Sequence, residues 1–470
     1  MDRNVTSPKQ EDPRQTPRRE WAKYFPIDRE YDRVREFKSV PNQLVVFVGK
    51  VSNERLDAWV DRLKKRVQEI SPDAQEIKAL SICGRCNESL VLLGGVGMEA
   101  FVKTEAAAKG SGSRPAPGAT GEDDGIYYSA NYVVDVPPKV EDETTTKNNN
   151  DTNSKGEPKP ENMVNVAVLD TGLAPNEVDQ YLITNSDPCI PGANKGWNFV
   201  RPGQPYTDDH PEFHGSTVTR LMLDRCMRFS DNIRIIPAKI HDQDGKCDLY
   251  SMLCALAYSA NMGAHIINAS FGYYAPWKYG EGFCVALFRE FIKEILTKQN
   301  ILLIAAAGNK PKVGEIEVMY ENPADVPADP CNLDDIHFFP ASFANDPELW
   351  NVISVTTLET DMSEVVSTQN YSIRVVDIGV PADDKGNGFI NPRVPGSFVK
   401  GSSFATPIVT GIIAGNYPKL KGITDKEKLI ERLIKLGLMR RKNSTADIRY
   451  AIAAKRKRTL LEIILSWFFG

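Results

Sequence analysis

The sequence has no apolar stretch of the length, about 18 residues, from which a transmembrane helix would be predicted. It also lacks an apolar run near its first residue, because the segment from Asn4 to Arg19 is polar. We therefore expect neither a membrane span nor a secretory signal, and a cytoplasmic protein. An excess of positive charge is missing too. The net charge of −5 gives no reason to expect a nucleic-acid partner.

Cysteine is scarce, with eight residues in a chain of 470. Without a secretory signal, this predicts mostly reduced thiols, whereas disulfides would favour the alternative of a secreted protein. Cys83 and Cys86 form one Cys-x-x-Cys pair. A structural zinc site needs four ligands, and no second pair stands at metal-ligand spacing. The pair is therefore interpreted as two neighbouring thiols, and we assign no metal ligand.

The first third of the chain divides into three parts. Residues 1–40 are polar and charged, which predicts a disordered arm, and residues 137–160 are acidic and lack apolar residues, as in a flexible linker. Between them, residues 41–136 form a candidate domain. Its apolar runs predict strands at 44–48, 79–83, 90–93 and 126–134, with helical patterns at 53–67 and 97–108. The order βαββαβ predicts a small α+β domain.

The pattern of apolar residues is different between residue 161 and about residue 420. Near-continuous apolar strands at 164–169, 233–238, 265–268 and 301–306 alternate with helical patterns at 216–227, 249–262 and 283–297. This alternation predicts an α/β domain in which helices cover both faces of a parallel sheet. Functional side chains in such folds gather at the carboxyl ends of the strands. A helical extension is expected over residues 421–470.

Polar residues stand at four such positions. Asp170 follows a buried strand, Asn309 follows another, and His214 and Ser403 begin helices. Each alone has a simpler interpretation as a turn former or helix cap. Together they provide what a serine nucleophile needs: a base, a carboxylate that orients the base, and a donor for the oxyanion.

The segments around these residues resemble a known family. Asp170-Thr171-Gly172, His214 to Val218, Ala307-Gly308-Asn309 and Gly401 to Pro407 resemble the four signature segments of the subtilisin family of serine proteases. The resemblance extends from about residue 164 to 416. It implies a serine endopeptidase in which Ser403 is the nucleophile, His214 the general base and Asp170 its orienting carboxylate. Asn309 would donate to the oxyanion with the Ser403 backbone N–H.

The same resemblance implies a substrate cleft. Ser270, Phe271 and Gly272 would line a groove that pairs with an extended peptide, and Ala305, Ala306, Ala307 and Gly308 would form one wall of the pocket for the side chain before the scissile bond. The acidic run at 315–335 favours basic side chains near that bond. The family requires no cofactor. It often binds calcium, but no acidic loop here is assigned to calcium.

The resemblance and the C-terminal tail also suggest binding partners. The resemblance implies a protein or peptide substrate and a regulated role, and residues 41–136 are similar in strand order to the family's inhibitory propeptides. The basic and then apolar tail, 455–469, could touch a membrane, although a packed terminal helix is favoured. A catalytically silent relative that binds peptides in its cleft is the alternative function.

Overall fold

The structure is a computed structural model, and it describes most of the chain from residue 163 together with the strands before it. The described residues are 39–48, Ala58, Asp61, Lys64, Lys65, 78–83, 89–95, 126–135, 163–184, 195–274, 281–311, 326–386, 388–441 and 448–452. Residues 1–38 of the arm expected at 1–40, the linker at 137–160, the helical pattern at 97–108 and the tail at 455–469 lie outside them, whereas residues 39 and 40 of the expected arm belong to a strand.

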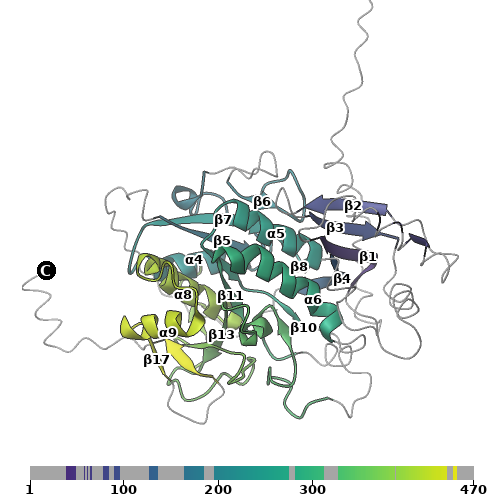
Figure 1. The fold of residues 1–470 in the computed structure, drawn as a ribbon. Helices are drawn as coiled ribbons and strands as arrows, with labels where there is room; N and C mark the ends of the chain where they lie inside the picture. The colour runs from purple at the N-terminus through teal and green to yellow at the C-terminus, as the bar shows by residue number, and fades with distance from the viewer. Residues whose placement is uncertain are drawn as a thin grey trace, which may run out of the picture.

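A nine-stranded sheet forms the centre of the larger part of the molecule (Figure 1). Its strand order is β17-β18-β14-β13-β11-β9-β5-β7-β6. All neighbouring strands run parallel except β17 and β18. The bounds are β5 Val164–Asp170, β6 Trp197–Asn198, β7 Ile233–Lys239, β9 Ile266–Ala269, β11 Leu302–Ala306, β13 Val352–Leu358, β14 Ile378–Pro381, β17 Met439–Arg441 and β18 Tyr450–Ile452.

Helices cover both faces of this sheet, which confirms the predicted α/β class. Alternate residues of β5 point to opposite faces: Val166 and Val168 pack with one set of helices, and Ala167 and Leu169 with the other. The first set is α4 His214–Cys226, α8 Ser402–Gly415 and α9 Lys426–Lys435. The second set is α5 Leu249–Asn261 and α6 Glu281–Phe291.

The remaining short elements connect these layers. Two-stranded ribbons pair β10 Tyr273–Tyr274 with β12 Phe338–Phe339, and β15 Phe389–Ile390 with β16 Phe398–Val399. The expected helix at 283–297 begins as α6 and continues as a wider π-type turn, Ile292–Leu296, and a 3-10 turn, Thr297–Gln299. It ends at Asn300, whose backbone is left-handed with φ 58°. The other 3-10 turns are Asp179–Tyr181, Ala341–Asn345 and Tyr417–Lys419.

A second sheet holds the four strands that the sequence predicted before residue 137. They are β1 Ser39–Val48, β2 Lys78–Cys83, β3 Ser89–Gly94 and β4 Ile126–Asp135. The order β2-β3-β1-β4 continues into a fifth strand, β8 Lys246–Asp248, which belongs to the larger part of the chain. Within the predicted helix at 53–67, the four described residues are all helical.

The N-terminal sheet docks on helices α5 and α6 (Figure 1). Val45, Phe47 and Val134 belong to the same apolar cluster as these helices, and the rings of Phe47 and Phe291 meet edge to face at 5.2 Å. The end of β4 pairs with β8 in antiparallel register, with Val134 opposite Cys247. A shared core and a shared sheet thus join the two parts of the chain.

One buried amide ties the docked sheet to α5. Asn131 on β4 is 1% exposed. Its Oδ1 accepts a hydrogen bond of 2.9 Å from the backbone N–H of Tyr250, in the first turn of α5, and its Nδ2 donates to Gln43 Oε1 at 2.8 Å. The first N–H groups of a helix lack partners within the helix, so Asn131 satisfies one of them from another domain.

The end of the chain differs from the expected helical extension. Helix α9 is followed by β17 and β18, and β18 joins the main sheet beside β14. These three-residue strands are too short to leave a periodic apolar signal in the sequence. Among the described residues, no helix has both the length and the apolar character needed to cross a bilayer.

The cysteines depart from the expected pattern at one position. Cys254 on α5 is disulfide-bonded, whereas Cys226 and Cys331 are free thiols. Burial raises the pKa of Cys226 to about 12 and that of Cys331 to about 11. Both thiols therefore stay protonated and unreactive at neutral pH.

Candidate active site

A buried carboxylate and a buried imidazole meet at the carboxyl end of the main sheet. Asp170 is the last residue of β5, and His214 is the first residue of α4. The Oδ1 atom of Asp170 lies 2.7 Å from Nδ1 of His214, and both side chains are 2% exposed. The backbone N–H of Thr171 donates to the same oxygen at 2.7 Å. This hydrogen bond leaves Nε2 of His214 as the free end of the ring, and Nε2 has no partner among the described residues.

The two groups shift each other's proton affinity. Burial by itself raises the pKa of Asp170, but the charge and hydrogen bond of His214 outweigh it, and the pKa lies below its ordinary value. Burial by itself lowers the pKa of His214, but the charge and hydrogen bond of Asp170 outweigh it, and the pKa lies above 6.5. Each partner thus stabilises the ionised form of the other.

Two further histidines lie nearby without adding charge. The ring of His210 lies 6.4 Å from that of His214, and the ring of His241 lies 5.4 Å from that of Phe271. Burial lowers the pKa of both, and that of His241 falls to about 3. Both rings therefore bind a proton less readily than His214 does.

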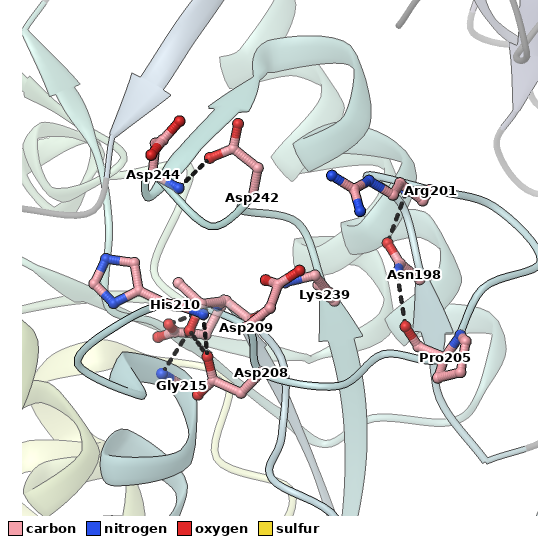
Figure 2. A network of polar contacts seen from close by, with 12 residues as sticks. Asn198, Arg201, Pro205, Asp208, Asp209, His210, Gly215, Lys239, Asp242 and Asp244 are labelled. Atoms are coloured by element: carbon pink, nitrogen blue, oxygen red, sulfur yellow. Dashed lines mark hydrogen bonds and ion pairs between the residues drawn. The ribbon is translucent and has the colours of Figure 1, made fainter. Parts of the chain in front are cut away.

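Asp208 holds the two halves of the pair together (Figure 2). Its carboxylate is buried, and Oδ1 accepts from Thr171 Oγ1 at 2.9 Å. Its Oδ2 accepts from both the N–H and the hydroxyl of Ser216, at 2.9 and 2.7 Å. Thr171 Oγ1 in turn accepts from the N–H of Gly215 at 2.9 Å. Hydrogen bonds through Thr171 and Asp208 thus join the end of β5 to the start of α4, next to the Asp170–His214 contact.

A buried lysine supports the same strand end. Lys239 closes β7 and is 2% exposed. Its Nζ donates to the carbonyl oxygen of Thr171 and lies 2.6 Å from Oδ1 of Asp209 (Figure 2). Burying an ammonium group is unfavourable unless it is paired, and these two acceptors provide the pairing.

Ser403, in the first turn of α8, lies beside Asn309, which follows β11. Gly401 caps this helix with φ 124°, a conformation that residues with a side chain rarely adopt. A Cβ atom at Gly401 would stand 3.4 Å from Oγ of Ser403, 3.4 Å from Oδ1 of Asn309 and 3.5 Å from its Nδ2. The hydroxyl and the amide therefore flank one small space. The Oδ1 atom of Asn309 accepts from the N–H of Ser402 at 3.3 Å, which orients the amide.

Packing also links the serine to the histidine. Phe404, the residue after Ser403, places its ring 4.9 Å from the ring of His214. On the other side, Ser270 donates its hydroxyl to the carbonyl oxygen of Ser403 at 2.8 Å. The amide of Asn268 donates to Ser270 and accepts from Thr410 on α8, both at 2.9 Å. The helix that carries Ser403 is thereby fixed to the end of β9.

The residues predicted to line a cleft are brought to the same edge of the sheet. Ser270 and Phe271 follow β9, Ala305 and Ala306 end the neighbouring strand β11, and Ala307 follows it. All are buried, with exposures of 0% or 1%. Gly272 and Gly308 end the two segments. The structure thus brings the two predicted walls together.

The sequence did not point to the residues that hold Asn309. The hydroxyl of Tyr274 on β10 donates to the carbonyl oxygen of Asn309 at 2.5 Å. The amide of Asn370 donates to Ala307 O at 2.8 Å, and its backbone N–H donates to Gly308 O at 3.1 Å. Neither Tyr274 nor Asn370 stands in a recognisable sequence motif, so only the folded structure identifies them. The same holds for Asp208 and Lys239, which support the Asp170–His214 pair.

Among the residues that the structure describes, no group of three or more His, Cys, Asp or Glu side chains is arranged to hold a metal ion. Two carboxylates of the acidic run are engaged in other contacts. Asp334 lies 3.0 Å from Nε of Arg374, and Asp329 accepts from the Tyr371 hydroxyl at 2.8 Å. Residues 315–325 of that run lie outside the described residues, and no residue is assigned to calcium.

Comparisons with known proteins bear on the same region. Residues 161–445 match the profile of a family described as the subtilase family, Peptidase_S8. Three similar solved structures are a lanthipeptide protease (19% identity, 62% of this chain and 85% of that chain, TM-score 0.45), the epidermin leader peptide processing serine protease EpiP from Staphylococcus aureus (16%, 87% and 96%, 0.49) and a cold adapted subtilisin-like serine proteinase (15%, 66% and 96%, 0.41). No curated protein matches the sequence.

The coupling between Asp170 and His214 predicts a titration. By NMR, the imidazole of His214 should take up its proton with a midpoint above 6.5, because Asp170 stabilises the cation. In Asp170→Asn that charge is lost and burial remains, so the midpoint should fall below 6.5. His265 is the control in both proteins. Burial and the charge of Lys421 lower its pKa, and Asp170 is not among the causes, so its midpoint should be the same in the two proteins. An unchanged midpoint for His214 would contradict the coupling.

Proposed function

Because the chain belongs to the subtilase family of serine endopeptidases, we propose that it hydrolyses peptide bonds with Ser403 as nucleophile, His214 as general base and acid, and Asp170 as the orienting carboxylate. The observation that carries this proposal is the buried contact of 2.7 Å between Asp170 and His214, beside a serine at the start of α8. The contact fixes the ring so that Nδ1 faces the carboxylate and Nε2 is left for the serine proton.

The reaction follows from this arrangement. Ser403 Oγ attacks the carbonyl carbon of the scissile bond while Nε2 of His214 takes its proton, and Asp170 stabilises the imidazolium ion. The carbonyl oxygen becomes an oxyanion beside the amide of Asn309, whose Oδ1 is already occupied by the Ser402 N–H. The NH₂ group of that amide is therefore the end that donates to the oxyanion. His214 then protonates the leaving amine, and water releases the acyl group.

Substitution of the nucleophile tests this assignment. Ser403→Ala should lower the turnover of peptides by several orders of magnitude, on the order of 10⁴ or more, with thermal unfolding unchanged, because only the hydroxyl is removed. Ser402→Ala is the matched control. Its hydroxyl accepts from the Gly308 N–H at 3.0 Å and takes no part in the proposed proton transfer, so turnover should fall far less than in Ser403→Ala. A Ser403→Ala protein that retains a tenth of wild-type turnover would overturn the assignment.

The second part of the proposal concerns regulation: residues 41–136 inhibit the catalytic domain to which they are docked. The support is the position of β8. The ring of His241 lies against Phe271 of the cleft, and the carboxylate of Asp242 accepts from the N–H groups of Asp244 and Lys246, both at 2.9 Å, in the turn that leads to β8 (Figure 2). Strand β4 of the N-terminal sheet therefore pairs with β8, which follows His241 in the chain by a few residues.

The path of the chain fits such an inhibitor. An extended segment that adds a strand to a sheet edge binds through its backbone, as a peptide substrate does. In this proposal the tail of the domain lies along Ser270 to Gly272, as a substrate strand would. The structure pairs Val133 to Asp135 with β8, and the residues after Asp135 lie outside the described range. Cleavage of the linker at 137–160 would turn a tethered inhibitor into one that can dissociate.

The buried amide of Asn131 gives this regulation a test. A separately produced segment 1–160 should slow peptide hydrolysis by a protein that begins at residue 161. In Asn131→Leu the Tyr250 N–H loses its acceptor, a change of about 1–3 kcal/mol, so inhibition should weaken roughly 5- to 150-fold. Asp61→Ala, at a side chain that is 72% exposed, is the control and should inhibit like the native segment. Absence of inhibition by the native segment at micromolar concentration would contradict the proposal.

A further inference from the structure

The space between the two predicted cleft walls holds the ring of Phe338. A Cβ atom added to Gly272 would stand 2.3 Å from Cε1 and 2.5 Å from Cζ of this ring. A Cβ atom added to Gly308 would stand 2.9 Å from its Cδ1 and Cε1. The ring thus contacts the glycines that end both wall segments. It is 4% exposed and shares an apolar cluster with Ala305 and Ala307.

The ring is held in this position from behind. Phe338 lies on β12, opposite Tyr274 of β10, and the two rings meet at 4.9 Å and 63°. The Tyr274 hydroxyl is bonded to the Asn309 carbonyl, and the Phe338 N–H donates to Ser342 Oγ at 3.0 Å. Movement of the phenyl ring away from the walls would require Tyr274 to break its contact with the segment that carries Asn309. Closely packed side chains rarely yield in this way.

We infer that Phe338 fills the pocket for the substrate side chain before the scissile bond and restricts that position to small residues, namely glycine, alanine and serine. This inference rests on the proposed function. The argument is steric: Ala305 to Ala307 and Gly272 carry little or no side chain and would leave room for a large substrate group, but an aromatic ring of this protein occupies that room. A leucine, phenylalanine or lysine side chain would have to displace it.

The same ring stands in the way of a basic substrate side chain. Among the described residues, Gly272, Gly308 and Tyr274 contact the ring, and none of them carries a negative charge. A buried cation needs a charged partner. Of the acidic run at 315–335, which is expected to attract basic residues, Asp334 lies 3.0 Å from Nε of Arg374, and residues 315–325 lie outside the described residues.

The test compares peptide substrates that differ only in the residue before the cut. With the full-length enzyme, kcat/KM for the alanine peptide should exceed that for the phenylalanine or lysine peptide by roughly 100-fold or more, since the larger groups do not fit. Phe338→Ala should raise kcat/KM for the phenylalanine peptide at least tenfold while the alanine peptide is still cleaved. Phe343→Ala is the matched control, because it removes a phenyl ring that is also 4% exposed but belongs to a different cluster. Its preference should stay that of the wild type.

Two results would overturn the inference. One is a wild-type enzyme that cleaves after phenylalanine, leucine or lysine as well as after alanine, and this measurement decides the matter even where Phe338→Ala fails to fold. The other is a folded Phe338→Ala enzyme with unchanged preference. Active-site titration with an organophosphonate separates these outcomes from failure of the proposed function: titrated enzyme with an unrestricted preference contradicts only the role of Phe338, whereas enzyme that does not titrate at Ser403 contradicts the catalytic assignment itself.

Discussion

A carboxylate and an imidazole that are both almost fully buried must stabilise each other, because water does not solvate them. Asp170 and His214 come from the end of a strand and the start of a helix that are 44 residues apart in the chain. Their ordinary fate in such surroundings would be neutralisation. The contact persists because Asp208 and Thr171 join the strand end to the helix start by hydrogen bonds, so that the carboxylate and the imidazole stay at hydrogen-bond distance.

The same constraint accounts for the small residues around the site. A Cβ atom on Gly215 would stand 2.4 Å from the carbonyl oxygen of Gly172, so the helix could not approach the strand end with any other residue there. On the opposite side of the cleft, Gly272 and Gly308 allow Phe338 to enter between the walls. Close backbone approach thus serves two purposes: it forms the Asp170–His214 contact, and it leaves the space that the phenyl ring then fills.

The sequence predicted the features that depend on local pattern. The parallel sheet follows from apolar runs such as Val164 to Leu169, and the meeting of Asp170, His214, Asn309 and Ser403 at one edge follows from the rule that strand ends gather there. It did not predict β8, because Lys246–Asp248 is polar and short and is a strand only where β4 pairs with it. Phe338 was missed for a related reason, since its role depends on contacts with glycines 66 and 30 residues away in the chain.

The central claim is that Ser403 is an activated nucleophile beside an oxyanion donor. Mass spectrometry after treatment with an organophosphonate tests it most directly, in enzyme from which the N-terminal segment has been removed. The account predicts one adduct per chain, on Ser403, none in Ser403→Ala, and a rate of modification lowered roughly 10²- to 10³-fold in Asn309→Ala, because the phosphonate oxygen needs the amide donor. No modification of the wild-type enzyme, or modification at another residue, would contradict the claim and favour a catalytically silent cleft that only binds peptides.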